Sequence, residues 1–127
     1  MIRVLIADDS EDTAEMFARF LESHGYDCRV ALGGEAALEL FGREKFDLIT
    51  VDLLMPEITG YEVAERLRRR DRLTPILLIT GKEDDVLVTP HAQHAGINAV
   101  LYKPIDPPVL LAKVRELTAG KAAHGTG

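Results

Sequence analysis

The segment that most constrains the fold runs from Leu48 to Gly60 and reads LITVDLLMPEITG. Its first four residues are apolar or β-branched, and the carboxylate of Asp52 follows them at once. Pro56 and Gly60 then interrupt any continuation of the strand. A short apolar run bounded in this way is typical of a strand buried on both faces of a parallel sheet. Asp52 is therefore expected at the carboxyl end of a central strand, where open α/β sheets bind their ligands.

Short apolar runs alternate with amphipathic segments along most of the chain. The predicted strands are Ile2–Ala7, Tyr26–Leu32, Phe46–Val51, Ile76–Ile79 and Ala99–Tyr102. Helices are predicted after Ser10, after Gly34, from about Thr59, from about Pro90 to Ala95, and from about Pro107 to Leu117. This alternation predicts an α/β fold: a doubly wound five-stranded parallel sheet covered by helices on both faces, a three-layer sandwich.

Length and composition set the class of protein. The 127 residues are expected to form one domain, residues 1–117, followed by a flexible C-terminal tail, residues 118–127. The net charge of −6 argues against direct nucleic-acid binding, and no apolar run approaches the roughly 18 residues of a membrane span. Cys28 is the single cysteine, and the N-terminus does not read as a signal peptide, so a cytoplasmic location is expected.

Polar residues follow four of the predicted strands. Asp8 and Asp9 follow the first, and Asp52, Thr80 and Lys103 follow the third, fourth and fifth. In a doubly wound sheet these positions converge on one crevice. Three carboxylates in one pocket repel one another unless a divalent cation is bound, and oxygen ligands with room for water suit Mg²⁺.

The same residues have the parts needed for phosphoryl transfer, which depends mostly on positioning and charge neutralisation. Asp52 is the predicted nucleophile and would form an aspartyl phosphate. Lys103 would pair with one phosphoryl oxygen, and the Thr80 hydroxyl would donate a hydrogen bond to another.

Taken together, Asp8-Asp9, Asp52 within DLLMPEITG, Thr80-Gly81 and Lys103-Pro104 resemble a response-regulator receiver domain of two-component signalling. The resemblance covers about Ile2 to Leu117 and implies a flavodoxin-like sheet with strand order 2-1-3-4-5. It also implies that Asp9 and Asp52 hold Mg²⁺ directly, with the backbone carbonyl of Leu54 as a third ligand and Asp8 acting mostly through water. A cis bond between Lys103 and Pro104 is implied as well.

The resemblance also implies partners. A sensor histidine kinase or phosphotransfer protein would supply the phosphoryl group to Asp52, and slow autodephosphorylation would remove it. A downstream effector protein or domain would receive the signal. The expected output surface consists of the predicted helix at Pro90, the strand Ala99–Tyr102 and the helix Pro107–Leu117, and a homodimer could form through it.

The chain departs from the family pattern near the pocket. Receivers usually carry an aromatic residue three positions before the lysine, where this chain has Val100. Tyr102 is the nearby aromatic, and it is expected to point elsewhere. Gly81 stands in place of the usual alanine after the threonine, and Ile105 in place of the usual phenylalanine after Lys-Pro.

Because valine has no ring to swing and few χ1 choices, the response to phosphorylation is expected to rest on the loop from Gly81 to Val88. Thr80 would move inward and reorder that loop. The short helix beginning at Pro90, with Thr89 as its N-cap, would shift in turn.

Two other functions compete with a phosphoacceptor. One is a phosphorylation-independent, receiver-like interaction module. The other is an aspartate-nucleophile phosphatase, which usually carries a second aspartate two residues after the first; that position here is Leu54.

Three further features have alternative interpretations. The basic run from Arg66 to Arg72 is either a patch for an acidic partner or a solvated helix end that complements the helix dipole. His91 and His94 are three residues apart and could touch one metal, but no further ligands stand near them in the sequence. Cys28 is interpreted as a small apolar strand residue rather than a redox switch.

Overall fold

The computed structural model describes residues 1–81 and 88–120. Within these residues the strands are β1 Arg3–Ala7, β2 Asp27–Ala31, β3 Leu48–Asp52, β4 Ile76–Thr80 and β5 Ala99–Tyr102. The helices are α1 Glu11–Glu22, α2 Gly34–Arg43, α3 Gly60–Arg68, α4 Val88–His94 and α5 Pro107–Leu117. The predicted alternation of strands and helices is confirmed, and β5 and α5 have the predicted bounds.

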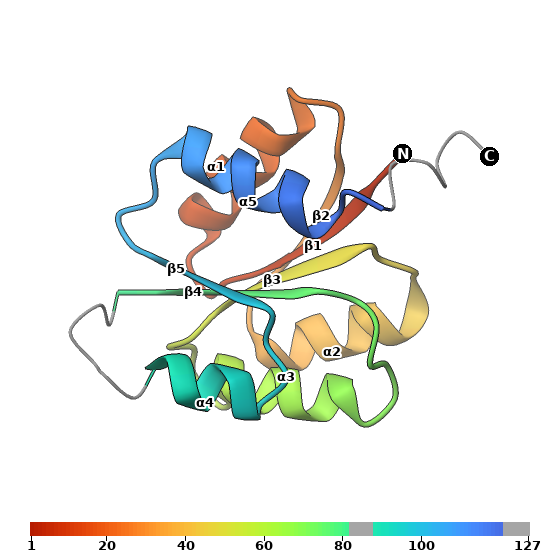
Figure 1. Ribbon diagram of the computed structural model, residues 1–127, viewed down its shortest axis with the longest axis vertical. Coiled ribbons are helices and arrows are strands. Elements are labelled where there is room, and N and C mark those ends of the chain that lie inside the picture. Colours follow the sequence, from red (N-terminus) through yellow and green to blue (C-terminus); the bar gives the residue numbers. More distant parts are fainter. Residues whose placement is uncertain (82–87, 121–127) are drawn as a thin grey trace.

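The strands form one parallel sheet in the order β2-β1-β3-β4-β5, as expected. Helices α1 and α5 cover one face, and α2, α3 and α4 cover the other (Figure 1). Each face has its own buried core, one against α2, α3 and α4 and the other against α1 and α5. The central strands β3 and β4 are buried along their whole length, which explains their uninterrupted apolar sequences.

Local signals in the sequence fix the starts of two helices. The Ser10 side chain accepts a hydrogen bond from the backbone N–H of Thr13, so Ser10 is the N-cap of α1. Thr59 caps α3 in the same way by accepting from the N–H of Glu62. Both caps place a helix N-terminus close to a strand end that carries an aspartate, β1 for α1 and β3 for α3.

The prediction for α4 was wrong at its start. The described part of the helix starts at Val88, so Thr89 lies inside it and is not its N-cap. Val88 is fully buried in the core beneath α2, α3 and α4. Pro90 is tolerated in the first turn because the N–H groups there have no partner within the helix. The helix is closed by Gly96 at a φ of 84°, as expected.

The expectation that Tyr102 points away from the face of Val100 was also wrong. Residues two apart on a strand point to the same face. Val100 and Tyr102 both pack against the core that contains Val88 and Ala92 of α4. The alternate residues of β5, Ala99 and Leu101, pack against the opposite core.

Three of the five arginines in the basic run at the end of α3 make contacts within the domain. Arg66 forms ion pairs with Glu35 and Glu62, with N···O distances of 3.0 and 2.6 Å. The Arg70 guanidinium donates to the backbone carbonyl of Leu38. Arg68 Nε donates to the carbonyl of Gly96, and Arg68 Nη2 donates to Asn98 Oδ1, both at 2.9 Å. These contacts favour a structural role for the run over a patch for an acidic partner.

Three smaller predictions concern the single cysteine, the two histidines of α4 and the C-terminal tail. Cys28 is buried in β2, and burial raises the pKa of its thiol to about 12, which keeps it unreactive at neutral pH. Neither His91 nor His94 joins a group of three possible metal ligands in the described parts of the chain. Thr118, the first residue of the predicted tail, is buried and its hydroxyl donates to the carbonyl of Val114. Ala119 and Gly120 form an exposed turn, and the rest of the predicted tail, residues 121–127, lies outside the described residues. The boundary between domain and tail stays a prediction.

Candidate functional site

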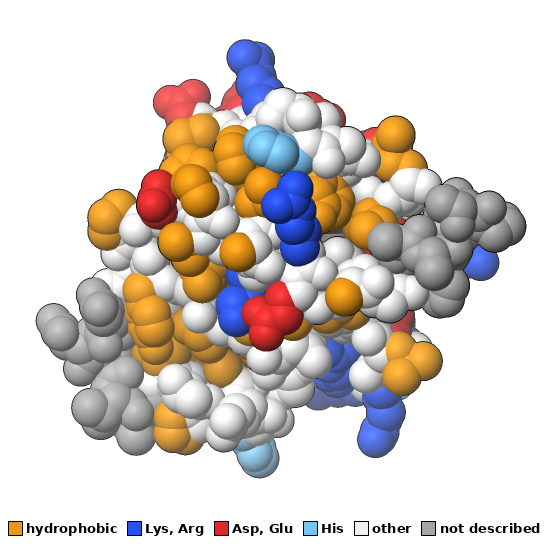
Figure 2. All heavy atoms as spheres, turned by 45° about the horizontal axis from the view of Figure 1, so that its top comes forward, with side chains coloured by type: hydrophobic (Ala, Val, Ile, Leu, Met, Phe, Trp, Pro, Cys, Tyr) orange, Lys and Arg blue, Asp and Glu red, His pale blue; other side chains and the backbone are white. Residues whose placement is uncertain are grey.

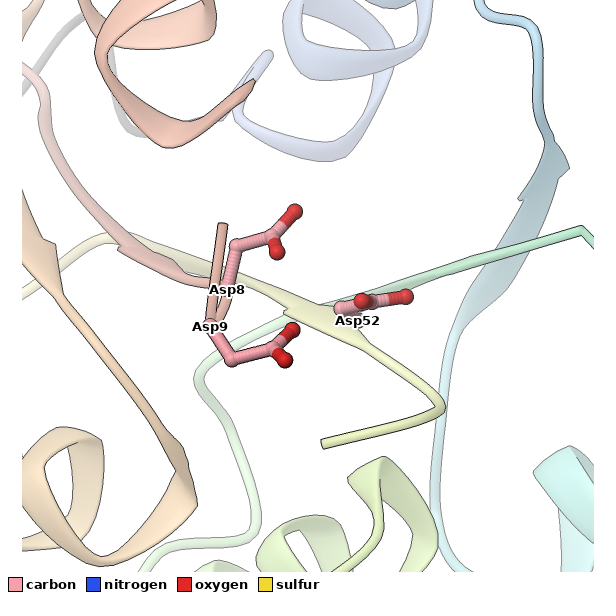
Figure 3. Close-up of side chains that lie close together, drawn as sticks. All are labelled: Asp8, Asp9 and Asp52. Atoms are coloured by element: carbon pink, nitrogen blue, oxygen red, sulfur yellow. The ribbon is translucent and has the colours of Figure 1, made fainter. Parts of the chain in front are cut away.

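The predicted site residues lie where strands end at one edge of the sheet. Asp8 and Asp9 follow β1, Asp52 and Thr80 are the last residues of β3 and β4, and Lys103 follows β5. Figure 3 shows Asp8, Asp9 and Asp52 side by side at the end of β1 and β3. Parallel strands bring their carboxyl ends to the same edge, so residues nearly one hundred positions apart meet there.

The three carboxylates form a compact acidic cluster. One oxygen from each of Asp8, Asp9 and Asp52 lies within 4.8 Å of the others. Asp8 and Asp52 are only 2% and 8% exposed, whereas Asp9 is exposed at the mouth of the cluster. Hard oxygen ligands at this spacing, with one side open to water, match the preference of Mg²⁺ for a few carboxylates and several waters. The donor set therefore fits the metal that the sequence predicts.

Lys103 supplies the positive charge of the site. Its Nζ lies 3.5 Å from Asp52 Oδ2 and 3.8 Å from Asp8 Oδ2. The backbone N–H of Lys103 donates to the carbonyl of Thr80 at 2.8 Å, which holds the end of β5 against β4. The Lys103–Pro104 bond is cis, as expected. One lysine thus faces two buried carboxylates.

Burial dominates the electrostatics of the two inner carboxylates. It raises the pKa of Asp52 above the usual range, and the neighbouring charge of Asp8 raises it further, while Lys103 opposes both effects. Burial likewise raises the pKa of Asp8. Two contacts oppose this rise: the Ser10 N–H, which donates to Asp8 Oδ1 at 2.9 Å, and the positive charge of Lys103. Desolvated like charges are costly, so the cluster favours a bound cation.

The β3–α3 loop is held close beneath Asp52. The Gly60 N–H donates to the carbonyl of Leu53, and the Leu53 N–H donates to the carbonyl of Ile79, both at 2.9 Å. A Cβ at Gly60 would lie 2.7 Å from the backbone oxygen of Asp52, so only glycine fits without displacing that strand end. Sequence reasoning recognised Gly60 as a turn residue but missed this close approach, which no local pattern reveals.

Leu54 lies in this loop, two residues after Asp52. Its side chain is 57% exposed beside the acidic cluster. The role expected for its backbone carbonyl as a metal ligand stays a prediction, as do the individual roles of Asp8, Asp9, Asp52, Thr80 and Lys103.

Comparison with known proteins decides the family. The family model of the response regulator receiver domain matches residues 4–115. The chain belongs to the response-regulator receiver domain family. This receiver domain is 34% identical over 118 residues to the alkaline phosphatase synthesis transcriptional regulatory protein PhoP of Bacillus subtilis, a match that covers 91% of this chain and 48% of that protein. It is also 34% identical over 116 residues to the response regulator MprA of Mycobacterium leprae, covering 91% and 50%. The receiver domain thus spans about half the length of these relatives.

Solved structures show the same fold. The chemotaxis protein CheY4 of Vibrio cholerae superposes with a TM-score of 0.88 at 30% identity, covering 92% of this receiver domain and 98% of that chain. The response regulator TrrA of Thermotoga maritima, solved in complex with Mg²⁺ and BeF, gives a TM-score of 0.84 at 30% identity and covers 92% and 99%. The predicted fold and strand order are therefore confirmed. None of the helices in the described parts of the chain has the length and apolar character required to cross a membrane.

Proposed function

We propose that this receiver domain is a phosphoacceptor switch in which Asp52 accepts a phosphoryl group from the phosphohistidine of a sensor kinase or phosphotransfer protein. The observation that carries the proposal is the position of Asp52: it lies 3.5 Å from Lys103 Nζ and within 4.8 Å of the carboxylates of Asp8 and Asp9. A nucleophile between an acidic cluster and a lysine has a place for a metal ion and a cation for the incoming phosphoryl oxygens.

In the proposed transfer, an Oδ atom of Asp52 attacks phosphorus while the phosphorus–nitrogen bond of the donor breaks, and the imidazole that leaves takes up a proton. Lys103 pairs with one phosphoryl oxygen, and the Thr80 hydroxyl donates to another. Asp8, Asp9, Asp52 and the Leu54 carbonyl would hold Mg²⁺, which supplies neutralisation of the developing negative charge. Later attack of water on phosphorus breaks the bond between phosphorus and the Asp52 oxygen, releases inorganic phosphate and regenerates the carboxylate, which resets the switch.

A groove beside Lys103 supports a protein as the donor. It encloses about 470 Å³ and is lined by Thr13, Met16, Phe17, Lys103, Pro104 and Ile105. The side chain of Met16 is exposed there. A donor protein seated on this apolar surface would bring its phosphohistidine beside the acceptor.

The output surface expected from the sequence comprises α4, β5 and α5. Figure 2 shows hydrophobic side chains gathered over the end of β5 and the start of α5, where Val109 is exposed. An exposed apolar patch of this kind suits docking to an effector or to a second copy of the chain. Effector binding and homodimerisation through this surface are part of the proposal.

The proposal is tested by incubating the protein with Mg²⁺ and acetyl phosphate and measuring its intact mass. We expect the gain of one phosphoryl group, lost on chelation of the metal and abolished by Asp52→Asn. Asp47→Asn is the control, because Asp47 lies at the opposite end of β3, and this variant should label normally. Undiminished labelling of Asp52→Asn would contradict the assignment, and a wild type that never gains mass would favour the phosphorylation-independent interaction module.

Lys103→Ala should uncouple phosphorylation from the conformational response. Lys103 pairs at 3.5 and 3.8 Å with two buried carboxylates, so its loss should lower the free energy of unfolding of the metal-free protein. The chemical-shift changes outside the pocket on phosphorylation should disappear, since no cation then pairs with the phosphoryl oxygen. Lys113→Ala, which removes a lysine paired with Glu116 on α5, is the control. An unaltered response in Lys103→Ala, measured by NMR, would rule out this role.

A further inference from the structure

The loop between β3 and α3 contains a strained turn beside the acidic cluster. Glu57 has a φ of 73°, in the left-handed region that residues other than glycine rarely adopt. The N–H of Ile58 donates to the carbonyl of Pro56 at 2.8 Å, so Glu57 is the central residue of a three-residue turn. A γ-turn with positive φ is rare and strained, and such strain persists only where the surrounding structure holds it.

Ile58 fastens this turn to the interior of the domain. Its side chain is only 8% exposed and packs in the core beneath α2, α3 and α4. Met55, on the other side of the turn, is buried in the same core, whereas Pro56 and Glu57 between them are exposed. The turn is therefore held by the side chains that flank it and not by its own central residue.

Gly34, in the first turn of α2, lies directly against Ile58. A Cβ at Gly34 would be 2.5 Å from Ile58 Cγ1, and 2.8 Å from both Ile58 Cδ1 and Val63 Cγ2. Carbon atoms in contact are normally about 3.5 to 4.0 Å apart, so a side chain at this position would displace Ile58. Helices α2 and α3 cover the same face of the sheet (Figure 1), and the missing Cβ lets α2 reach the loop that precedes α3.

The loop that Ile58 holds includes the backbone next to Asp52. Leu53 is fixed by two backbone hydrogen bonds of 2.9 Å, one to the carbonyl of Ile79 and one from the N–H of Gly60. Leu54 follows with a side chain that is 57% exposed. Because Leu53 is fixed to the sheet, a displacement of the turn is taken up at Leu54.

We propose that Gly34 and Ile58 are positioning residues for the metal: their contact holds the strained turn and thereby sets the direction of the Leu54 carbonyl. The inference rests on the proposed function, in which that carbonyl is a ligand of Mg²⁺. Magnesium requires near-octahedral geometry with short bonds to oxygen, so a small displacement of one ligand lowers its affinity. The groups behind a ligand matter for the same reason, because they fix its orientation.

Gly34→Ala should weaken Mg²⁺ binding about tenfold, which is typical of losing a group that orients a ligand. The added Cβ moves Ile58 and the turn, so the amide resonances of Leu54 and Met55 should already shift in the metal-free protein. A Mg²⁺ titration followed by amide chemical shifts measures both, and circular dichroism shows that the variant is folded.

Gly42→Ala is the matched control for this titration. It makes the same substitution in the same helix, and its Cβ would lie 3.3 Å from Arg70 Nη1, away from the loop. Both the Mg²⁺ affinity and the metal-free resonances of Leu54 and Met55 should keep their wild-type values.

A double variant separates positioning from a general loss of packing. Ile58→Ala should also weaken Mg²⁺ binding, because it removes the side chain that fastens the turn. In Gly34→Ala/Ile58→Ala the new methyl group enters the space that Ile58 Cγ1 and Cδ1 leave. The double variant should therefore bind Mg²⁺ more tightly than either single variant, whereas two independent defects would add.

Ile58→Val provides a milder test that does not depend on whether Gly34→Ala folds. It removes Cδ1 alone, so the variant should fold and the metal-free Leu54 resonance should still shift. An unchanged Leu54 resonance in this variant would overturn the positioning role. Wild-type Mg²⁺ affinity in folded Gly34→Ala would do the same, as would a double variant that binds more weakly than both single variants.

Intact mass after incubation with acetyl phosphate keeps the two proposals apart. A wild type that binds Mg²⁺ but gains no phosphoryl group would overturn the phosphoacceptor function alone. A wild type that binds no Mg²⁺ would overturn both proposals.

Discussion

Replacing Asp9 with asparagine is expected to weaken Mg²⁺ binding by at least about tenfold while the fold persists. Asp9 is the exposed member of the acidic cluster, so its removal takes away a charged ligand without opening the core. Replacing a residue that only hydrogen-bonds to a metal ligand lowers metal affinity roughly 10- to 100-fold. Replacing a direct ligand should lower the affinity for Mg²⁺ by at least as much. A Mg²⁺ titration followed by amide chemical shifts measures the dissociation constant.

The matched control for this titration is Asp12→Asn. Asp12 is another exposed acid, in the first turn of α1, and it lies outside the cluster. Its replacement removes the same charge from the same end of the molecule, so it reports any general electrostatic effect. Equal affinities in Asp9→Asn and wild type would show that other groups hold the cation.

The free energy of unfolding of this protein should depend on pH and on whether Mg²⁺ is bound. Burial raises the pKa of Asp8 and Asp52 in the folded state, so the folded protein binds more protons than the unfolded chain does just above the usual aspartate range. The free energy of unfolding of the metal-free protein should therefore fall as the pH rises through the folded pKa values, and then level off.

Mg²⁺ should reverse this loss at neutral pH, since it binds the deprotonated carboxylates. At a free concentration one hundred times its dissociation constant it should add about 2.7 kcal/mol to the free energy of unfolding. Asp52→Asn removes one of the buried charges, so it should raise the melting temperature of the metal-free protein by a few degrees and reduce the gain from Mg²⁺. Thermal melts at several pH values, with and without Mg²⁺, measure both effects.

Asp106→Asn serves as the control, because Asp106 is exposed and its side chain makes no capping hydrogen bond. It should follow the wild-type profile with and without metal. A metal-free protein whose stability rises with pH over the same window would contradict the destabilising role assigned to the two buried carboxylates.

The fold class was predictable from the amino-acid sequence, and so was the group of strand-end residues that the structure brings together. Local signals sufficed for the elements: the apolar run before Asp52 predicts a central strand, and Ser10 and Thr59 mark helix starts through their own side chains. Since parallel strands share one carboxyl edge, the order of elements alone predicted that Asp8, Asp52 and Lys103 would meet.

Tertiary structure decided how these residues meet and what surrounds them. Val88 is helical and buried against distant helices, although Thr89 and Pro90 give a local signal for a helix start after it. The register of Thr80 with Tyr102 was not predicted from the sequence, nor was the close approach of Gly60 to Asp52. These features depend on packing between segments far apart in the chain, whereas propensity and capping act over only a few residues.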